Sequence, residues 1–273
     1  MRAWSAASRP TSRVVFLHGI TSHGGWYERC AESLAAGGCE VAFLDRRGSG
    51  LNGEAMGDVD KWQTWLDDVA TYLKAARQAD ADSPLGAPLP TILCGISWGG
   101  KLAAAVARRY PGLLAGLALV CPGLYSPYLP GFGKRLALAA PAPPRLRRRR
   151  FNVPLRYPEL FTEAPCWQAF IGSDPLALRT VTWRFAREDR QLTRYAREAA
   201  TFLYLPTLLM LAGQDRIVDN GRTLEYFGRV AGYQKSLVEY QGAAHTLEFE
   251  ADPRRYFADL GRWVRGVACG GSG

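Results

Sequence analysis

The chain has 273 residues, of which 48% are hydrophobic and 22% are charged, and its formal net charge is +9. This composition excludes a disordered chain and is sufficient for one domain with a sizeable core. No apolar run reaches the length of a transmembrane helix, and the N-terminus lacks the apolar stretch and cleavage site of a signal peptide. We therefore expect a soluble, unprocessed protein.

Six short apolar runs along the chain predict strands at 12–19, 40–45, 90–97, 114–123, 206–215 and 235–242. The longer segments between them have helical spacing and predict helices at Tyr27–Ala36, Lys61–Ala79, Lys101–Tyr110, Gly221–Ala231 and Pro253–Val267. The apolar stripe of Lys61–Ala79 is typical of core packing. Alternating strands and helices predict an α/β fold, a mostly parallel twisted sheet with helices on both faces. Such sheets bind ligands at the carboxyl ends of their strands.

One region interrupts the alternation of strands and helices. Residues 125–203 begin with proline- and glycine-rich stretches and continue with helical-looking sequence such as LALRTVTWRFARED. This order predicts an inserted, mainly helical cap over 125–203, which leaves 1–124 and 204–273 as the α/β core.

The positive charge is concentrated within this inserted region. Lys134–Arg156 holds eight basic residues and no acidic one, so the rest of the chain is nearly neutral. A solvated basic loop is the simpler interpretation, although such a charge can also attract an anionic ligand or lipid surface. The sequence has no RNA-recognition or helix-turn-helix pattern, and we expect no nucleic-acid partner.

The cysteines favour a reducing compartment. They are far apart and show no C-x-x-C spacing, and at least two of them fall in apolar runs where a thiol acts as a small hydrophobic group. They are Cys30, Cys39, Cys94, Cys121, Cys166 and Cys269. We expect a cytoplasmic protein.

The stretch GISWGG at residues 95–100 follows a predicted strand and precedes a predicted helix. A G-x-S-x-G motif in this context is typical of a sharp turn that exposes a serine nucleophile, because the glycines remove side chains that would collide with the strand and helix. The motif is weak evidence alone, and its context strengthens it. Ser97 is therefore the candidate nucleophile.

A serine hydroxyl needs a base and an acid that orients the base. His245 follows the last predicted strand, and Asp215 ends the strand before it, with Asp219 and Glu248 as fallback acids. The order Ser97, Asp215, His245 is the order expected for α/β-hydrolases. His18 and His23 follow the first strand, and we expect each to be structural or to face the substrate.

Acyl transfer also needs backbone N–H groups directed at the developing oxyanion. The amide of Trp98, directly after the nucleophile, is one candidate. The amide of Ile20, in the loop after the first strand, is the other.

Five segments resemble the serine hydrolases of the α/β-hydrolase fold, and within them the monoacylglycerol lipase and lysophospholipase-like group. They are FLHGI (16–20), FLDRRGSGLN (43–52), GISWGG (95–100), LAGQDRIVDN (211–220) and GAAHTLEFE (242–250). The resemblance implies Ser97 as nucleophile, Asp215 as acid, His245 as base, and the Ile20 and Trp98 amides as the oxyanion hole. The chain departs from the family's common GHSMGG, and its short N-terminus leaves little room for the two antiparallel strands that usually open the fold.

The resemblance implies a carboxylic ester hydrolase that acts on acyl-glycerols or lysophospholipids through an acyl-enzyme, without metal or cofactor. His18, Phe132 and Leu136 are candidate substrate contacts, and Lys134–Arg156 is a candidate contact with anionic lipid. An acyltransferase, perhydrolase or aminopeptidase would use the same triad. A non-catalytic protein that binds a small molecule or a membrane surface is the alternative of another class. The sequence predicts no oligomeric state.

Overall fold

The structure, a computed structural model, describes residues 1–84, 86–128 and 144–270. A seven-stranded sheet has the order β1-β3-β2-β4-β5-β8-β9. Its strands are β1 (Arg2–Trp4), β2 (Ser12–Leu17), β3 (Cys39–Leu44), β4 (Thr91–Ile96), β5 (Gly116–Val120), β8 (Thr207–Ala212) and β9 (Lys235–Tyr240). All neighbouring strands are parallel except β1 and β3. The sheet confirms the predicted α/β class and contains all six predicted strands.

The burial of each strand follows its place in the sheet. The central strands β5 and β8 are buried throughout, whereas the edge strands β1 and β9 are at most half-buried. A parallel sheet covered on both faces requires such continuous apolar runs in its centre. Leu17 pairs with Leu44 on one side and Gly95 on the other, so β2, β3 and β4 end at the same edge of the sheet.

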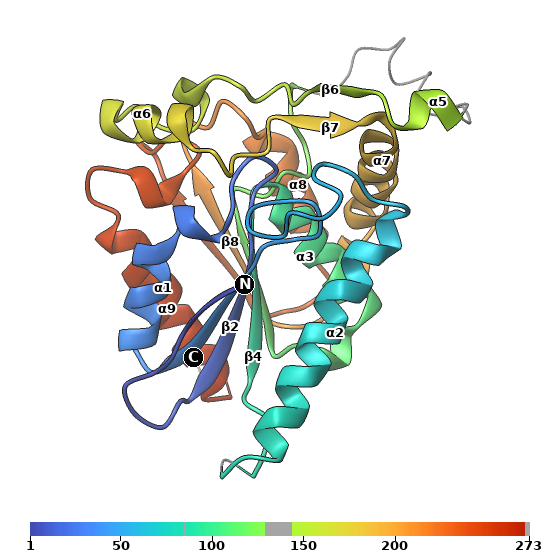
Figure 1. The fold of residues 1–273 in the computed structure, drawn as a ribbon. Coiled ribbons are helices and arrows are strands. Elements are labelled where there is room, and N and C mark those ends of the chain that lie inside the picture. Colours follow the sequence, from blue (N-terminus) through green and yellow to red (C-terminus); the bar gives the residue numbers. More distant parts are fainter. Residues whose placement is uncertain (85, 129–143, 271–273) are drawn as a thin grey trace.

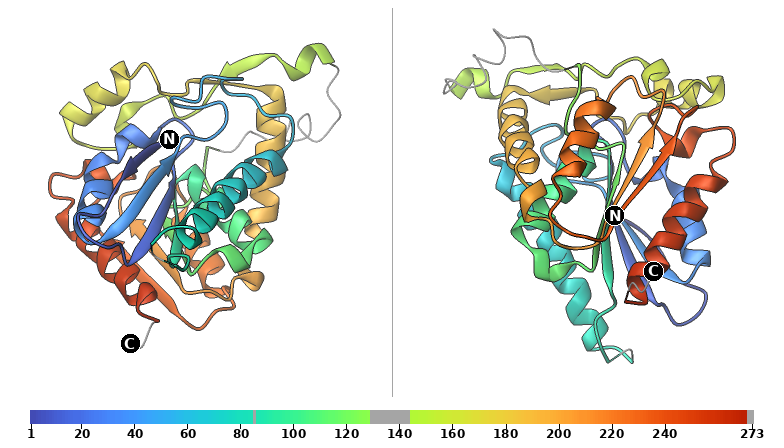
Figure 2. Two further views of the ribbon diagram at one scale, coloured as in Figure 1. Left: turned by 60° about the horizontal axis from the view of Figure 1, so that its bottom comes forward. Right: turned by 180° about the vertical axis from the view of Figure 1, so that it is seen from behind.

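Helices cover both faces of the sheet, as predicted. The helices α1 (Glu28–Ala36) and α9 (Arg254–Ala268) lie on one face, and α2 (Trp62–Ala81), α3 (Trp98–Arg109) and α8 (Asn220–Gly228) lie on the other (Figures 1 and 2). The α2 stripe buries Trp65, Leu66, Val69, Ala70 and Leu73, which confirms the core packing expected for it. Short 3-10 helices are Gly24–Trp26, Pro111–Leu113, Pro158–Leu160, Ala200–Phe202 and Leu247–Phe249.

The described part of residues 125–203, the segment predicted to be inserted, lies across the carboxyl edge of the sheet (Figure 1). Its described elements are α5 (Pro144–Arg147), β6 (Arg150–Asn152), α6 (Pro165–Ser173), β7 (Thr180–Thr182) and α7 (Trp183–Arg197). The antiparallel pair β6–β7 is a second small sheet that the sequence pattern does not predict. Backbone hydrogen bonds from Leu178 to Thr21 and from Thr246 to Phe161, each 2.9 Å, join the segment to the loops at this edge.

The N-terminus contributes one antiparallel strand, β1, which pairs with β3 through Arg2 and Phe43. It has three residues. Within residues 1–84, 86–128 and 144–270, no helix is long and apolar enough to cross a membrane.

Candidate active site

Ser97 lies on the sharp turn between β4 and α3. Its backbone angles, φ 54° and ψ −119°, are outside the regions that L-residues commonly occupy. A Cβ on Gly95 would collide with the carbonyl oxygen of Gly99, and one on Gly99 would collide with that of Leu17. This turn therefore needs glycine at both 95 and 99, because neither position has room for a side chain.

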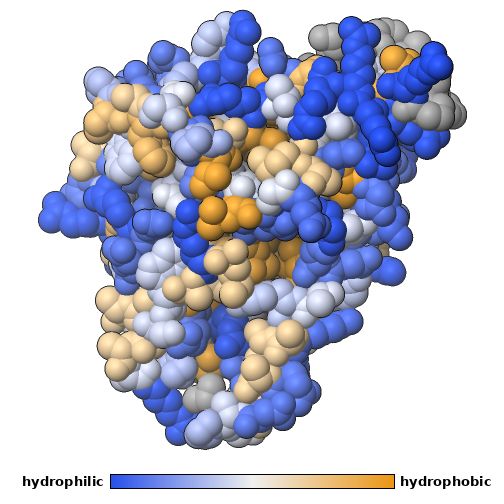
Figure 3. Space-filling view, in the orientation of Figure 1, coloured by the Kyte–Doolittle hydropathy of each residue, from blue (hydrophilic) through white to orange (hydrophobic). Residues whose placement is uncertain are grey.

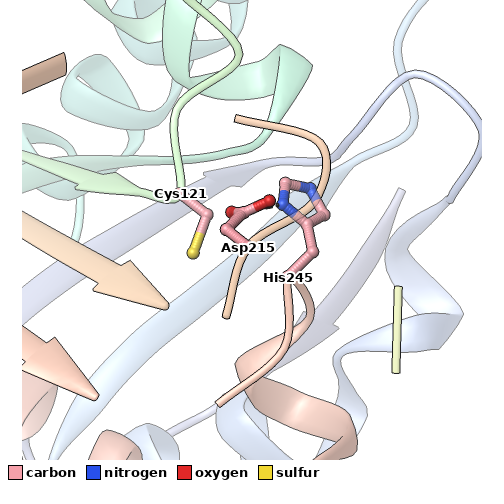
Figure 4. A group of neighbouring side chains, drawn as sticks. All are labelled: Cys121, Asp215 and His245. Carbon is pink, nitrogen blue, oxygen red and sulfur yellow. Dashed lines mark hydrogen bonds and ion pairs between the residues drawn. The ribbon is translucent and has the colours of Figure 1, made fainter. Parts of the chain in front are cut away.

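The structure brings Ser97, His245 and Asp215 together from three separate loops at the carboxyl edge of the sheet. The Ser97 Oγ lies 2.9 Å from His245 Nε2, and His245 Nδ1 lies 2.7 Å from Asp215 Oδ2. The His245 and Asp215 side chains are 2% and 0% exposed. Figure 4 shows the Asp215 carboxylate beside the imidazole ring. This arrangement joins a hydroxyl, a base and an acid in one hydrogen-bonded chain that is shielded from water.

The surroundings of Asp215 determine the tautomer of His245. Asp215 Oδ1 accepts hydrogen bonds from the amides of Ile217 (2.8 Å) and Val218 (2.9 Å), which leaves Oδ2 for the imidazole. Burial favours the protonated carboxyl, but the charge and hydrogen bond of His245 together with the two amides outweigh it and lower the pKa of Asp215. An ionised Asp215 accepts a hydrogen bond from Nδ1–H, so the proton stays on Nδ1 and the lone pair of Nε2 is free to accept the proton of Ser97.

The two fallback acids have other partners. Asp219 caps the N-terminus of α8, where its side chain accepts a hydrogen bond from the Arg222 amide. Glu248 accepts a hydrogen bond from the Cys30 amide in α1. The structure therefore places Asp215 alone of the three against the imidazole of His245.

The Trp98 and Ile20 amides both lie close to the nucleophile in the chain or in space. Trp98 is the first residue of α3, and the first amides of a helix have no partner within it. Ile20 follows Gly19, where an added Cβ would lie 3.6 Å from Ser97 Oγ. In the described part of the chain, neither amide donates a hydrogen bond. Both are therefore available to an incoming oxygen atom.

Comparison with known proteins shows the family of this chain. Residues 8–252 match the family described as "Serine aminopeptidase, S33". The chain belongs to this family.

Several relatives of this S33 chain have the names of lipolytic enzymes. Phospholipase YtpA of Bacillus subtilis is 27% identical, over 94% of this chain and 96% of the relative. The monoacylglycerol lipase of Mycolicibacterium smegmatis is also 27% identical, over 96% of this chain and 90% of the relative. The solved structure of Paleococcus ferrophilus monoacylglycerol lipase is 21% identical, has a TM-score of 0.83, and covers 97% of this chain and 98% of that chain. The structural match shows the α/β-hydrolase fold.

Of the two roles expected for His18, structural or facing the substrate, its contacts in the structure are structural. Its side chain is buried, and its Nε2 accepts the Arg46 amide at 3.2 Å while Nδ1 lies 2.8 Å from the Gly19 carbonyl oxygen. Burial and the adjacent Arg46 lower the pKa of His18 to about 3, so the ring is neutral. Both nitrogens are engaged within the chain, and His18 supports the loop that carries Ile20.

His23 likewise has a structural partner. Its Nδ1 accepts the Gly25 amide, and its Nε2 donates to Asp174 Oδ2 at 3.1 Å. Asp174 belongs to the inserted segment and also accepts the Trp26 Nε1–H at 2.6 Å. This buried pair joins the loop after β2 to the inserted segment, which fits the structural role that the sequence left open for His23.

The other two expected substrate contacts, Phe132 and Leu136, lie outside the described residues. The same holds for residues 134–143 of the basic stretch. Its described part begins at Pro144, and the side chains of 145–150 are exposed.

A cysteine adjoins the triad at the end of β5. The ligand atoms of Cys121, Asp215 and His245 lie within 4.8 Å of one another (Figure 4). The imidazole is already bound to Asp215 and Ser97. Burial raises the pKa of the Cys121 thiol, which disfavours the thiolate that binds metals. The donors are therefore arranged for a triad, and they do not fit a metal site well.

Sequence reasoning missed one buried residue beside the site, Arg46. It follows β3 in FLDRRGSGLN, and its guanidinium contacts the loop that carries Ile20. A charged residue directly after the predicted strand at 40–45 is the signal that could have found it, because such positions lie at the carboxyl edge.

Proposed function

We propose that this chain hydrolyses carboxylic esters of the acyl-glycerol or lysophospholipid type through an acyl-enzyme. Ser97 is the nucleophile, His245 is the general base and acid, and Asp215 orients the imidazole. The observation that carries this proposal is the hydrogen-bonded chain Ser97–His245–Asp215, with separations of 2.9 and 2.7 Å. The lipolytic names of the relatives support the substrate class.

Acylation begins when the ester carbonyl carbon lies against Ser97 Oγ. His245 Nε2 takes the hydroxyl proton as Oγ attacks, and the carbonyl oxygen becomes an oxyanion. The amides of Ile20 and Trp98 stabilise this oxyanion, and one such donor typically contributes about 10²- to 10³-fold in rate. The tetrahedral intermediate then breaks its ester bond, and His245 gives its proton to the departing alkoxide oxygen. An alcohol leaves, and the acyl group remains on Ser97.

Deacylation repeats these steps with water. His245 Nε2 takes a proton from water, the hydroxide oxygen attacks the acyl carbon, and the same two amides hold the second oxyanion. When the bond to Oγ breaks, His245 returns its proton to Ser97. The carboxylic acid leaves, and the enzyme regains its starting state.

The inserted segment, residues 125–203, is proposed to be a cap subdomain on a core of 1–124 and 204–273. Its Phe161 ring stands edge-on to the His245 ring, with centroids 6.0 Å apart. Phe161 also packs against Trp26, which forms an aromatic cluster with Phe170 and Phe249. Apolar rings next to the catalytic imidazole suit an acyl chain, whose burial contributes about 0.8 kcal/mol per methylene.

The basic stretch Lys134–Arg156 is proposed to contact anionic lipid at the membrane surface. Its described part combines exposed arginines with the exposed side chains of Leu146 and Phe151. Figure 3 shows hydrophilic side chains gathered at the upper right, over α5 and β6 of Figure 1. Basic residues near an anionic surface contribute about 1 kcal/mol each at moderate salt.

All six cysteines are free, which supports the proposed cytoplasmic location.

A substrate panel with a matched variant tests the function. The panel contains p-nitrophenyl esters from two to sixteen carbons, a monoacylglycerol, a lysophosphatidylcholine and an amino-acyl p-nitroanilide. We expect ester turnover in the wild type and its loss, by at least about 10³-fold, in Ser97→Ala. Turnover of the anilide without turnover of any ester would contradict the proposed esterase activity and would favour the aminopeptidase activity named in the family's description. No turnover and no labelling by a fluorophosphonate would refute an enzyme of this class.

A further inference from the structure

Arg46 is a buried cation without an ion-pair partner in the described part of the chain. The residue is 7% exposed, and its guanidinium donates to two backbone carbonyl oxygens, Gly19 O from Nη1 (2.8 Å) and Ile20 O from Nη2 (2.6 Å). Burial lowers the pKa of Arg46 to about 9, against the attraction of Asp189 and Asp45, and the group stays charged at neutral pH. Removal of a cation from water costs several kcal/mol, so its retention here indicates a function.

The first of these carbonyls belongs to the peptide group that supplies the proposed oxyanion donor. The Gly19 C=O and the Ile20 N–H are two ends of one planar peptide group. A hydrogen bond to the Gly19 oxygen therefore also fixes the direction of the Ile20 N–H. His18 Nδ1–H donates to the same Gly19 oxygen at 2.8 Å, because its Nε2 accepts the Arg46 amide. Donation to a carbonyl also polarises the attached N–H and strengthens it as a donor.

The same guanidinium contacts the residue that carries the second amide. The Arg46 Cζ lies 4.6 Å from the centroid of the Trp98 ring. The Trp98 Nε1–H donates to Asp189 at 2.5 Å, and Asp189 pairs with Lys101 at 2.6 Å. These contacts hold the Trp98 indole in place, so Arg46 contacts both the loop that carries Ile20 and the side chain of Trp98.

We propose that Arg46 is a positioning residue of the oxyanion hole, which aligns and polarises the Ile20 amide through the Gly19 carbonyl and adds a fixed positive charge at the carbonyl end of that peptide group. This inference rests on the proposed function. It assigns Arg46 an effect on the transition state and none on the bound ester, because the Ile20 amide gains most when the oxygen carries charge.

The test uses Arg46→Met and Arg46→Lys, with Arg47→Met as the matched control. Arg47 is an exposed neighbour whose guanidinium pairs with Asp68 at the surface. In Arg46→Met we expect kcat to fall about 10²-fold, comparable to the loss of one oxyanion donor, with KM unchanged within about threefold. Arg46→Lys keeps the charge but cannot donate to both carbonyl oxygens from a planar guanidinium, and kcat should fall about tenfold or more. Arg47→Met should match the wild type.

A trifluoromethyl ketone distinguishes positioning from a merely structural role, because its adduct with Ser97 carries an oxyanion. Its inhibition constant should rise in each Arg46 variant by the same factor as kcat/KM falls, while binding of the neutral product alcohol should not change. An inhibition constant equal to that of the wild type would overturn the proposal, as would a rise in KM that matches the loss of kcat/KM. If Arg46→Met does not fold, Arg46→Lys decides, and wild-type kcat in it refutes the proposal. Failure of the wild type to hydrolyse esters would instead refute the proposed function.

Discussion

Replacement of Asp215 by Asn should reverse the tautomer of His245 without a change in packing. Asp215 Oδ1 accepts two amide hydrogen bonds, at 2.8 and 2.9 Å from Ile217 and Val218. In the Asn variant only the amide oxygen can accept these bonds, so its NH2 group must face His245 Nδ1. That nitrogen must then accept a hydrogen bond, and the ring proton moves to Nε2. The imidazole would present a donor to Ser97 Oγ, and it could not act as a base.

The expected cost of Asp215→Asn is about 10⁴-fold in kcat. That factor is typical when the wrong tautomer faces the serine of a triad, and it corresponds to about 5.4 kcal/mol at about 1.36 kcal/mol per tenfold. The Asp215 side chain is 0% exposed, so water cannot replace the carboxylate. The effect should be in kcat, with KM little changed, because the ester does not contact residue 215 in the proposed mechanism.

Steady-state hydrolysis of p-nitrophenyl butyrate measures this loss, with melting temperature as a test of folding. The matched control is Asp219→Asn, because Asn caps a helix as well as Asp does and α8 should be unaffected. A loss below about tenfold in a folded Asp215→Asn variant would refute the assignment of Asp215. A comparable loss in Asp219→Asn would refute it equally.

Three further predictions concern stability. Gly99→Ala should lose at least about 3 kcal/mol of unfolding free energy in urea, because its Cβ would collide with a backbone carbonyl of β2, whereas Gly112→Ala, with open space around it, should not. Burial raises the pKa of Glu248 from 4.5, its value when exposed, to about 8. The protonated carboxyl therefore stabilises the folded state fully below about pH 4.5, and this stability is lost as the pH rises through about 8. Glu248→Gln should therefore lose less melting temperature than the wild type between pH 6 and 9, and equal losses would contradict this. Asp174→Ala should cost about 2 kcal/mol or more, because it removes the oxygen that accepts the Nε2–H of His23 and the buried indole N–H of Trp26, and unchanged urea unfolding would exclude that role.

The sheet and its helices could be predicted because the pattern is local. Each central strand is buried on both faces and reads as a continuous apolar run, and each covering helix shows one apolar stripe. The strand Arg2–Trp4 is too short and too exposed for such a pattern. The pair Arg150–Asn152 and Thr180–Thr182 forms between segments about thirty residues apart, and no local pattern reports that pairing.

The candidate site could be predicted as far as chain order and strand ends define it. Ser97 and Asp215 end predicted strands and His245 follows one, and parallel strands end at one edge, so their proximity follows from topology. The burial of His18 and the contacts of Arg46 do not follow in this way. Both depend on contacts between the loop after β2 and the loop after β3. The sequence pattern does not report which loops come into contact.

The most direct measurement is the location of the acyl group during turnover. The enzyme is mixed with excess p-nitrophenyl ester, quenched with acid within milliseconds, digested and analysed by mass spectrometry. The proposed mechanism predicts one acyl group per chain, bound to Ser97, and a burst of p-nitrophenol equal to the enzyme concentration if deacylation is the slow step. Acylation of another residue, or wild-type ester turnover in Ser97→Ala, would contradict the assignment of Ser97 as the nucleophile.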